Sequence, residues 1–68
     1  MSNQDNKNID FHILVIDDDQ RLRALLRKFL ENNGFRVSDA EDANQAKIIM
    51  ESIIFDLLVI DVMMPGQN

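Results

Sequence analysis

The fold is decided by two short stretches that both run into aspartate, ILVIDDD at residues 13–19 and LLVID at residues 57–61. Each begins with four apolar residues and shows no alternation between apolar and polar positions. Continuous runs of this kind are typical of strands that are buried on both faces of a parallel sheet. We therefore predict a parallel strand at each stretch, with acidic residues at its carboxyl end.

The first strand is followed by an amphipathic pattern over residues 20–32. Its apolar residues are spaced i, i+3, i+4, i+7 and i+8, which places them on one face of a helix: Leu22, Leu25, Leu26, Phe29 and Leu30. Asp19 is suited to cap the amino end of this helix, and Gly34 is suited to the left-handed conformation just past its end. The pattern predicts a helix over 20–32 with both boundaries defined.

A shorter strand and a second helix are predicted before the last strand. Residues 35–38 (FRVS) alternate and follow a helix terminator, which favours a strand. The acids at 39–42 suit a helix amino end, and Ala43, Ala46, Ile49 or Met50, and Ile53 follow at helical spacing, which predicts a helix of about 10 residues. The order β-α-β-α-β implies an α/β protein with right-handed crossovers, a parallel sheet and helices on both faces.

The composition of the 68 residues narrows the possible functions. There is no cysteine and only one histidine, which excludes disulfides, thiolate metal sites and histidine clusters. A net charge of −5 argues against direct nucleic-acid contact by this segment. The longest apolar runs have four residues, against roughly 20 that span a bilayer, and the amino end lacks a signal pattern. We therefore expect a cytoplasmic protein without membrane contact.

Three carboxylates that follow the predicted strands form the candidate site. Ligands of an open parallel sheet bind beyond the carboxyl ends of its strands. If the strands at 13–16 and 57–60 are neighbours, Asp17, Asp18 and Asp61 meet in one cleft. Carboxylates without histidine or cysteine suit Mg²⁺ or Mn²⁺ and argue against zinc or copper. Such an ion would orient a phosphoryl donor, and a carboxylate can act as the nucleophile that forms an aspartyl phosphate.

The other charged residues are interpreted mainly as structural. Asp19 is either a helix cap or a part of the acidic site, and His12 is a structural residue. The basic residues of the first helix are most simply its solvated face, with a partner-docking surface as the alternative: Arg21, Arg23, Arg27 and Lys28. The scattered acids are interpreted as solvated or capping residues: Asp10, Asp39, Glu41, Asp42, Glu51 and Asp56.

The stretches ILVIDDDQRLRALLRKFLENNGF (13–35) and FDLLVIDVMMPG (55–66) resemble the receiver domain of two-component response regulators, especially those of winged-helix transcription-factor type. The likeness combines a strand ending in an acidic pair, an arginine- and leucine-rich helix, and a third strand ending in aspartate before a Met-Met-Pro-Gly loop. It implies that Asp61 is the phosphoacceptor, that Asp17 and Asp18 bind Mg²⁺, and that Met63 supplies a backbone carbonyl to the metal. It also implies a signalling module rather than an enzyme, with a sensor histidine kinase as the partner that docks partly on the first helix.

The resemblance further implies a flavodoxin-like sheet of which residues 9–68 form the N-terminal half. Residues 1–8 are polar and without periodicity, which predicts a flexible tail. The sheet would be truncated after the third strand, without the Ser or Thr of the fourth strand and the Lys of the fifth. With the strand order 2-1-3-4-5, the third strand is then an edge. An apolar edge strand is a template for pairing, so we expect self-association through this strand.

Other functions stay open alongside this one. The chain could be a non-signalling, oligomerising fragment, which phosphoryl uptake from a small phosphodonor would exclude. It could also be a Mg²⁺-dependent phosphatase of haloacid-dehalogenase-like type, with Asp17 and Asp19 as the D-x-D pair. That family usually continues with a small residue and then Thr or Val, whereas Gln20 and Arg21 follow here. A Walker B interpretation of LLVID lacks a preceding glycine-rich phosphate loop.

Overall fold

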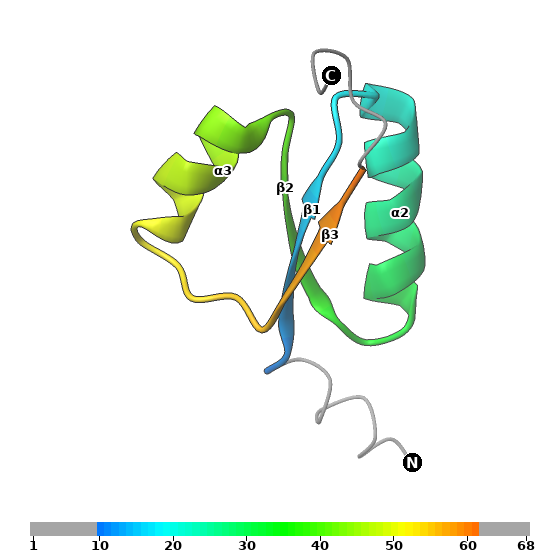
Figure 1. Cartoon of the computed structure of the whole chain (residues 1–68). Coiled ribbons are helices and arrows are strands. Elements are labelled where there is room, and N and C mark those ends of the chain that lie inside the picture. Colours follow the sequence, from blue (N-terminus) through cyan, green and yellow to red (C-terminus); the bar gives the residue numbers. More distant parts are fainter. Residues whose placement is uncertain (1–9, 62–68) are drawn as a thin grey trace.

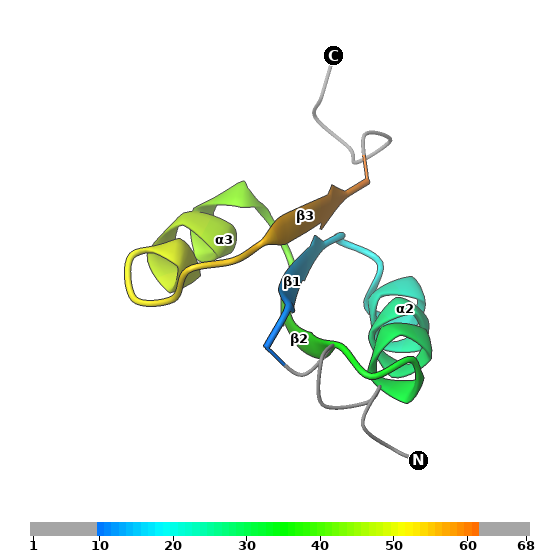
Figure 2. The same cartoon turned by 90° about the horizontal axis from the view of Figure 1, so that it is seen from below.

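Residues 10–61 form a three-stranded parallel sheet with a helix on each face. The structure is a computed structural model that describes residues 10–61. The elements follow one another as β1 (His12–Ile16), α2 (Gln20–Asn32), β2 (Arg36–Ala40), α3 (Ala43–Met50) and β3 (Leu57–Ile60). The strand order is β2-β1-β3, and Figure 1 and Figure 2 show α2 and α3 on opposite sides of the sheet. The predicted order β-α-β-α-β and the parallel sheet are confirmed.

The central strand β1 divides the core into two halves, because its successive side chains point to opposite faces of the sheet. The half on the α3 side contains Leu14, Ile16, Ala40 and Ala46, and the half on the α2 side contains Ile13, Val15 and Val37. All five residues of β1 are buried. The strand has a hydrogen-bonded neighbour on each side and a helix over each face, so the continuous apolar run at 13–16 predicted its position correctly.

Helix α2 begins and ends where the sequence predicts. The Asp19 carboxylate accepts hydrogen bonds from the backbone N–H groups of Arg21 at 3.0 Å and Leu22 at 3.2 Å. Gly34 has a φ of 92°, and its N–H donates to the carbonyl of Glu31 at 3.0 Å. These contacts satisfy backbone groups that a helix leaves without partners at its two ends, which explains both boundaries.

The boundary between β2 and α3 differs from the prediction. The strand predicted at residues 35–38 extends to Ala40, because its last two residues pair in register with the end of β1. Asp39 is therefore a strand residue and not part of a helix amino end. The cap of α3 is Asp42, whose carboxylate accepts the N–H of Gln45 at 2.8 Å, and the helix has 8 residues. The predicted helix of about 10 residues was slightly too long, since α3 ends at Met50 and Ile53, expected at helical spacing, lies beyond it.

Strand β3 lies at the edge of the sheet, although its sequence repeats the pattern of β1. Within residues 10–61 it pairs only with β1. Leu57, Leu58 and Ile60 are 47%, 40% and 50% exposed. Among residues 10–61, β3 is therefore an edge strand, as expected, and its side chains are less covered than those of β1 despite the same apolar pattern.

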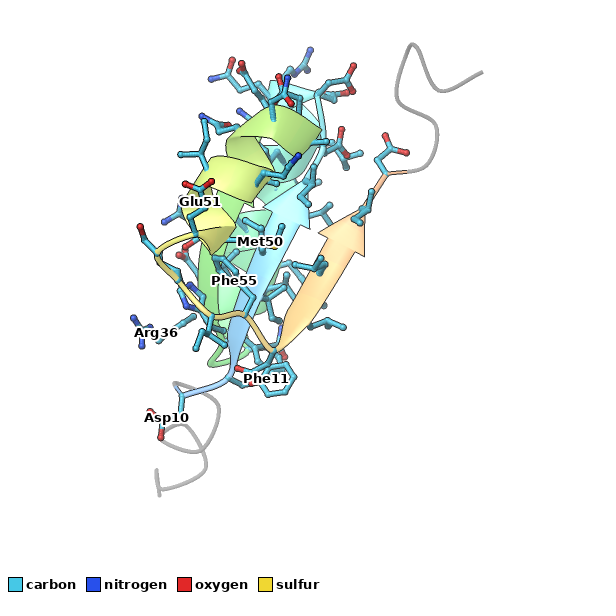
Figure 3. All side chains as sticks on the ribbon, turned by 60° about the vertical axis from the view of Figure 1, so that its left-hand side comes forward. Asp10, Phe11, Arg36, Met50, Glu51 and Phe55 are labelled. Atoms are coloured by element: carbon cyan, nitrogen blue, oxygen red, sulfur yellow. The ribbon has the colours of Figure 1, made fainter. Side chains whose placement is uncertain are left out.

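The segment between α3 and β3 returns to the sheet through Phe55. Figure 3 shows Phe55 between the end of α3 and the sheet, and the residue packs against the core half on the α3 side. Its ring also lies edge-on to the ring of His12, with centroids 4.5 Å apart. This packing leads the chain into β3 beside β1.

Some expectations concern residues outside those that the structure describes. The predicted tail at residues 1–8 lies there, and so do Met63 and the rest of the Met-Met-Pro-Gly loop. Neither of the two helices found between residues 10 and 61 is long and apolar enough to cross a membrane.

Candidate functional site

The candidate site lies at the carboxyl ends of β1 and β3, where these two strands are neighbours. Ile16 and Ile60 are partners in the parallel register, so the residues that follow them emerge side by side. The N–H of Asp61 donates to the carbonyl of Ile16 at 3.1 Å, which extends the pairing by one residue. The sequence predicted the site only if the two strands are neighbours, and β1 and β3 are indeed adjacent.

The structure brings Asp17, Asp18 and Asp61 together as predicted. One carboxylate oxygen from each of the three residues lies within 4.8 Å of the other two. The three side chains differ in burial: Asp17 is 2% exposed, Asp18 is exposed and Asp61 is half-buried. The site is thus a shallow acidic cleft with one buried and two accessible carboxylates.

Asp17 is held firmly by its surroundings. Its N–H donates to the carbonyl of Ala40 at 3.1 Å, and its carboxylate Oδ1 accepts the N–H of Asp19 at 2.9 Å. Its carbonyl oxygen accepts a hydrogen bond from Nη1 of Arg23 at 2.7 Å. Backbone and side chain of this buried residue therefore have fixed positions, and β2 and α2 both contribute to fixing them.

The donor set fits a hard divalent cation. Mg²⁺ binds oxygen ligands at about 2.0–2.1 Å, so two ligands on opposite sides of the ion are about 4.2 Å apart. The oxygens of the three aspartates are spread over a similar range, at most 4.8 Å. The one histidine begins β1, about 16 Å from Asp17 along the strand, so the cluster offers oxygen ligands alone.

Asp19 does not belong to this cluster. Its Oδ1 accepts the N–H groups of Arg21 and Leu22, so the residue acts as the helix cap, one of the two roles considered for it. Asp17 and Asp19 consequently do not form a D-x-D pair in the cleft, because only Asp17 of these two belongs to the acidic cluster. The partner of Asp17 from a distant part of the chain is Asp61.

A cavity of about 190 Å³ adjoins the acidic cleft between α2 and β3. Asp17 and Asp61 contribute to its wall, and the rest of its lining is apolar: Val15, Ile16, Leu22, Leu26, Val59 and Ile60. The two carboxylates therefore border a pocket that is open to solvent and whose remaining lining is apolar.

Sequence reasoning missed an ion-pair network behind the cleft. Arg23 was interpreted as solvated, but its side chain is 15% exposed and its Nε donates to Asp39 at 3.2 Å. Arg27 approaches the other oxygen of Asp39 at 3.4 Å. The interpretation of Asp39 as a solvated acid is therefore also wrong. The i, i+4 spacing of the two arginines beside the apolar stripe was the available signal, because that spacing puts both on one side of the helix.

The opposite end of the sheet contains a different polar cluster around His12. Its Nε2 lies 3.0 Å from Oγ of Ser38, and its backbone N–H donates to the carboxylate of Asp56 at 2.8 Å. Burial lowers the pKa of His12, the charge of Arg36 lowers it further, and the charge of Asp56 acts in the opposite direction. His12 is thus integrated into the fold, as expected for a structural residue.

Comparison with known proteins identifies the family of the chain. Residues 13–68 match the family model of the response regulator receiver domain. Protein PetR of Rhodobacter capsulatus is 49% identical over 57 residues, which are 84% of this chain and 24% of PetR. Transcriptional regulatory protein CpxR of Escherichia coli is 48% identical over 56 residues, which are 82% of this chain and 24% of CpxR.

The chain spans about a quarter of the length of these curated relatives. No solved structure matches it significantly. The family match begins at the second residue of β1 and includes every later element of the sheet. Because this match covers most of the chain, the protein belongs to the family of response regulator receiver domains.

Proposed function

We propose that this protein is a phosphoaccepting receiver segment of a two-component response regulator, in which Asp61 accepts a phosphoryl group from a sensor histidine kinase. The observation that carries the proposal is the meeting of Asp17, Asp18 and Asp61 at adjacent strand ends, with carboxylate oxygens within 4.8 Å. The family match over residues 13–68 supports the same function.

Asp61 is suited to the role of nucleophile by its position. It follows β3 directly and is half-buried, whereas Asp17 is buried and its Oδ1 already accepts a backbone N–H. In the proposed step an oxygen of Asp61 attacks phosphorus, the P–N bond of a phosphohistidine breaks, and a P–O bond forms. The electron pair of the broken bond goes to the imidazole nitrogen, which is then protonated. The protein thus serves as phosphoacceptor and signal carrier rather than as an enzyme.

The three aspartates would hold Mg²⁺ or Mn²⁺, and the backbone carbonyl of Met63, outside the described residues, would be a further ligand. When bound, such an ion neutralises charge that develops on the transferring phosphoryl group. Asp17 would contribute a carboxylate that accepts the N–H of Asp19, on a backbone that β2 and α2 hold in place. Asp18 and Asp61 complete the oxygen set from the accessible side of the cleft.

The partner that delivers the phosphoryl group would contact the protein partly through α2. Leu25 and Phe29 on this helix are 64% and 62% exposed, and the basic residues Arg21 and Lys28 are exposed nearby. An apolar surface with basic residues around it suits a protein partner that carries acidic residues. We place this encounter in the cytoplasm, without direct nucleic-acid contact by this segment, whose net charge is −5.

The test is phosphorylation by a small phosphodonor in the presence of Mg²⁺, followed by intact mass measurement. We expect a gain of one phosphoryl group that hydroxylamine removes, because acyl phosphates are cleaved by this nucleophile. Asp61→Asn should abolish the gain, whereas Asp10→Asn, which removes an exposed acid at the opposite end of the sheet, should leave it unchanged. Equal uptake by Asp61→Asn and the unaltered protein would refute the assignment.

A second candidate property is self-association through β3. Among residues 10–61, β3 pairs with another strand on one side only. Three of its four residues are at least 40% exposed. Exposed apolar edges favour pairing with another chain. Light scattering over a concentration series should then show a mass that rises with concentration, and a constant monomer mass would refute this property without affecting the phosphoryl assay.

A further inference from the structure

Arg23 has an unusual position for a charged helix residue. It lies in the first turns of α2, and its side chain is only 15% exposed. Its Nη1 donates to the carbonyl oxygen of Asp17 at 2.7 Å, and its Nε donates to a carboxylate oxygen of Asp39 at 3.2 Å. One guanidinium group therefore connects the end of β1, helix α2 and strand β2.

The carbonyl contact completes the fixation of Asp17. The N–H of this residue is held by β2, and its carboxylate is held by the N–H of Asp19. Among the hydrogen bonds of residues 10–61, the guanidinium of Arg23 is the only side-chain partner of the peptide group between Asp17 and Asp18. Without the guanidinium, this peptide group would lose that partner. An uncompensated change in the backbone torsion on either side of this planar peptide group would move the carboxylates of Asp17 and Asp18 relative to each other.

The charge of Arg23 is balanced at the same place. Asp39 accepts from Arg23 through one oxygen and approaches Arg27 through the other. Arg27 also pairs with Glu31 at 3.1 Å, so two carboxylates face the two guanidinium groups, and the positive charge that Arg23 places beside a cation site is offset. Because the charge is offset, the remaining effect of Arg23 on the site is mainly geometric.

We infer that Arg23 is a positioning residue for the metal site of the proposed function: by linking the Asp17 carbonyl to Asp39, it holds Asp17 and Asp18 in the geometry that binds the cation. The inference rests on the proposed metal site. Arginine is required because its planar group directs separate N–H donors to two acceptors, whereas a lysine ammonium acts as a compact point charge.

Geometry and charge predict opposite results when Arg23 is removed. If Arg23 acted through charge alone, Arg23→Ala would remove a repulsive cation and Mg²⁺ would bind more tightly. If it acts as a positioning residue, Mg²⁺ should bind about 10- to 100-fold more weakly, the range typical for partners that orient metal ligands. The sign of the change therefore separates the two mechanisms.

The experiment is a Mg²⁺ titration of the intact protein, followed by backbone amide shifts in NMR spectra and by calorimetry. The variants are Arg23→Ala, Arg23→Lys and, as a control of equal charge on the same helix, Arg21→Ala, because Arg21 is exposed. We expect weaker binding in both Arg23 variants and no weakening in Arg21→Ala. Arg23→Lys keeps the charge and a long apolar stem, so it reports on the same question if Arg23→Ala does not fold.

The outcomes distinguish this inference from the function on which it rests. Equal or tighter Mg²⁺ binding in a folded Arg23 variant would overturn the positioning role and leave the metal site intact. Equal Mg²⁺ binding by the unaltered protein, Asp17→Asn and Asp61→Asn in the same titration would overturn the metal site and the inference together. Weaker binding in the Arg23 variants, with Arg21→Ala unchanged, would support both.

Discussion

Strands β1 and β3 have nearly the same sequence pattern and very different surroundings. ILVI and LLVI are both followed by aspartate, yet the apolar residues of β1 are at most 4% exposed whereas three of those in β3 are 40–50% exposed. β1 pairs with β2 and β3 and has a helix over each face, while β3 pairs with β1 alone among the described residues. An apolar run thus shows that a strand can be buried. The strands and helices that pack around it decide what fraction of its side chains is buried.

The same contrast applies to the aspartates that follow the two strands. Asp17 after β1 is 2% exposed and has its N–H, its carbonyl and its carboxylate in hydrogen bonds. Asp61 after β3 is half-buried and lines the pocket beside the cleft. This difference fits the proposed roles, in which the fixed carboxylate holds a cation and the accessible carboxylate reacts.

The largest effect is expected from truncating register partners in the two strands. Leu14 of β1 and Leu58 of β3 are paired residues, 0% and 40% exposed. Leu14→Ala should lower the free energy of unfolding by about 2–5 kcal/mol, the range for buried leucine. Leu58→Ala should lower it by about 1–2 kcal/mol, because less apolar surface is lost from the interior.

Urea unfolding of both variants in the intact protein measures this difference. A leucine elsewhere on the surface, such as Leu25, which is 64% exposed, provides a control that should change little. Equal losses for Leu14→Ala and Leu58→Ala would mean that β3 is covered as fully as β1 in solution, and the contrast between the strands would then disappear.

An intermediate effect is expected from Mg²⁺. Binding to the folded state at ten times the dissociation constant should raise the free energy of unfolding by about 1.4 kcal/mol. Asp17→Asn and Asp61→Asn should each abolish this increase, because the site takes ligands from both strand ends, and Asp10→Asn should retain it. Thermal unfolding with and without Mg²⁺ tests the prediction. A full increase in Asp61→Asn would restrict the site to the end of β1.

The smallest effect is expected from pH at the amino end of β1, far from the cleft. Burial lowers the pKa of His12 in the folded state, so the unfolded chain binds its proton more readily. The contribution to stability is therefore complete above the ordinary histidine pKa of about 6.5 and is lost as pH falls through the lower value of the folded state. Asp56 and Arg36 are the charged neighbours that act on this group.

His12→Gln isolates this contribution, because an amide can still bond to Ser38 but does not titrate. Urea unfolding on both sides of the histidine pKa should show a loss of stability on acidification that is smaller in His12→Gln than in the unaltered protein. The same loss in both would assign the pH dependence to carboxylates instead of His12.

Much of the fold and of the candidate site could be predicted from local patterns. The cap at Asp19 and the terminator at Gly34 defined α2 because their hydrogen bonds join residues within one turn. The three aspartates were assigned to one place because carboxyl ends of neighbouring parallel strands lie at the same sheet edge. The extension of β2 to Ala40 was missed because it depends on pairing with β1, which leaves no mark in residues 35–40 themselves.

The amino-acid pattern was sufficient for the type and order of the elements and for the residues of the acidic cleft. Which strand is buried, and which arginine supports Asp17, became visible only in three dimensions. Arg23 and Asp39 are 16 residues apart and meet because α2 crosses the sheet beside β2. Hydrogen bonds within a turn depend on neighbours along the chain, whereas burial and the pairing of distant charges depend on neighbours in space, and those neighbours exist only once the sheet has assembled.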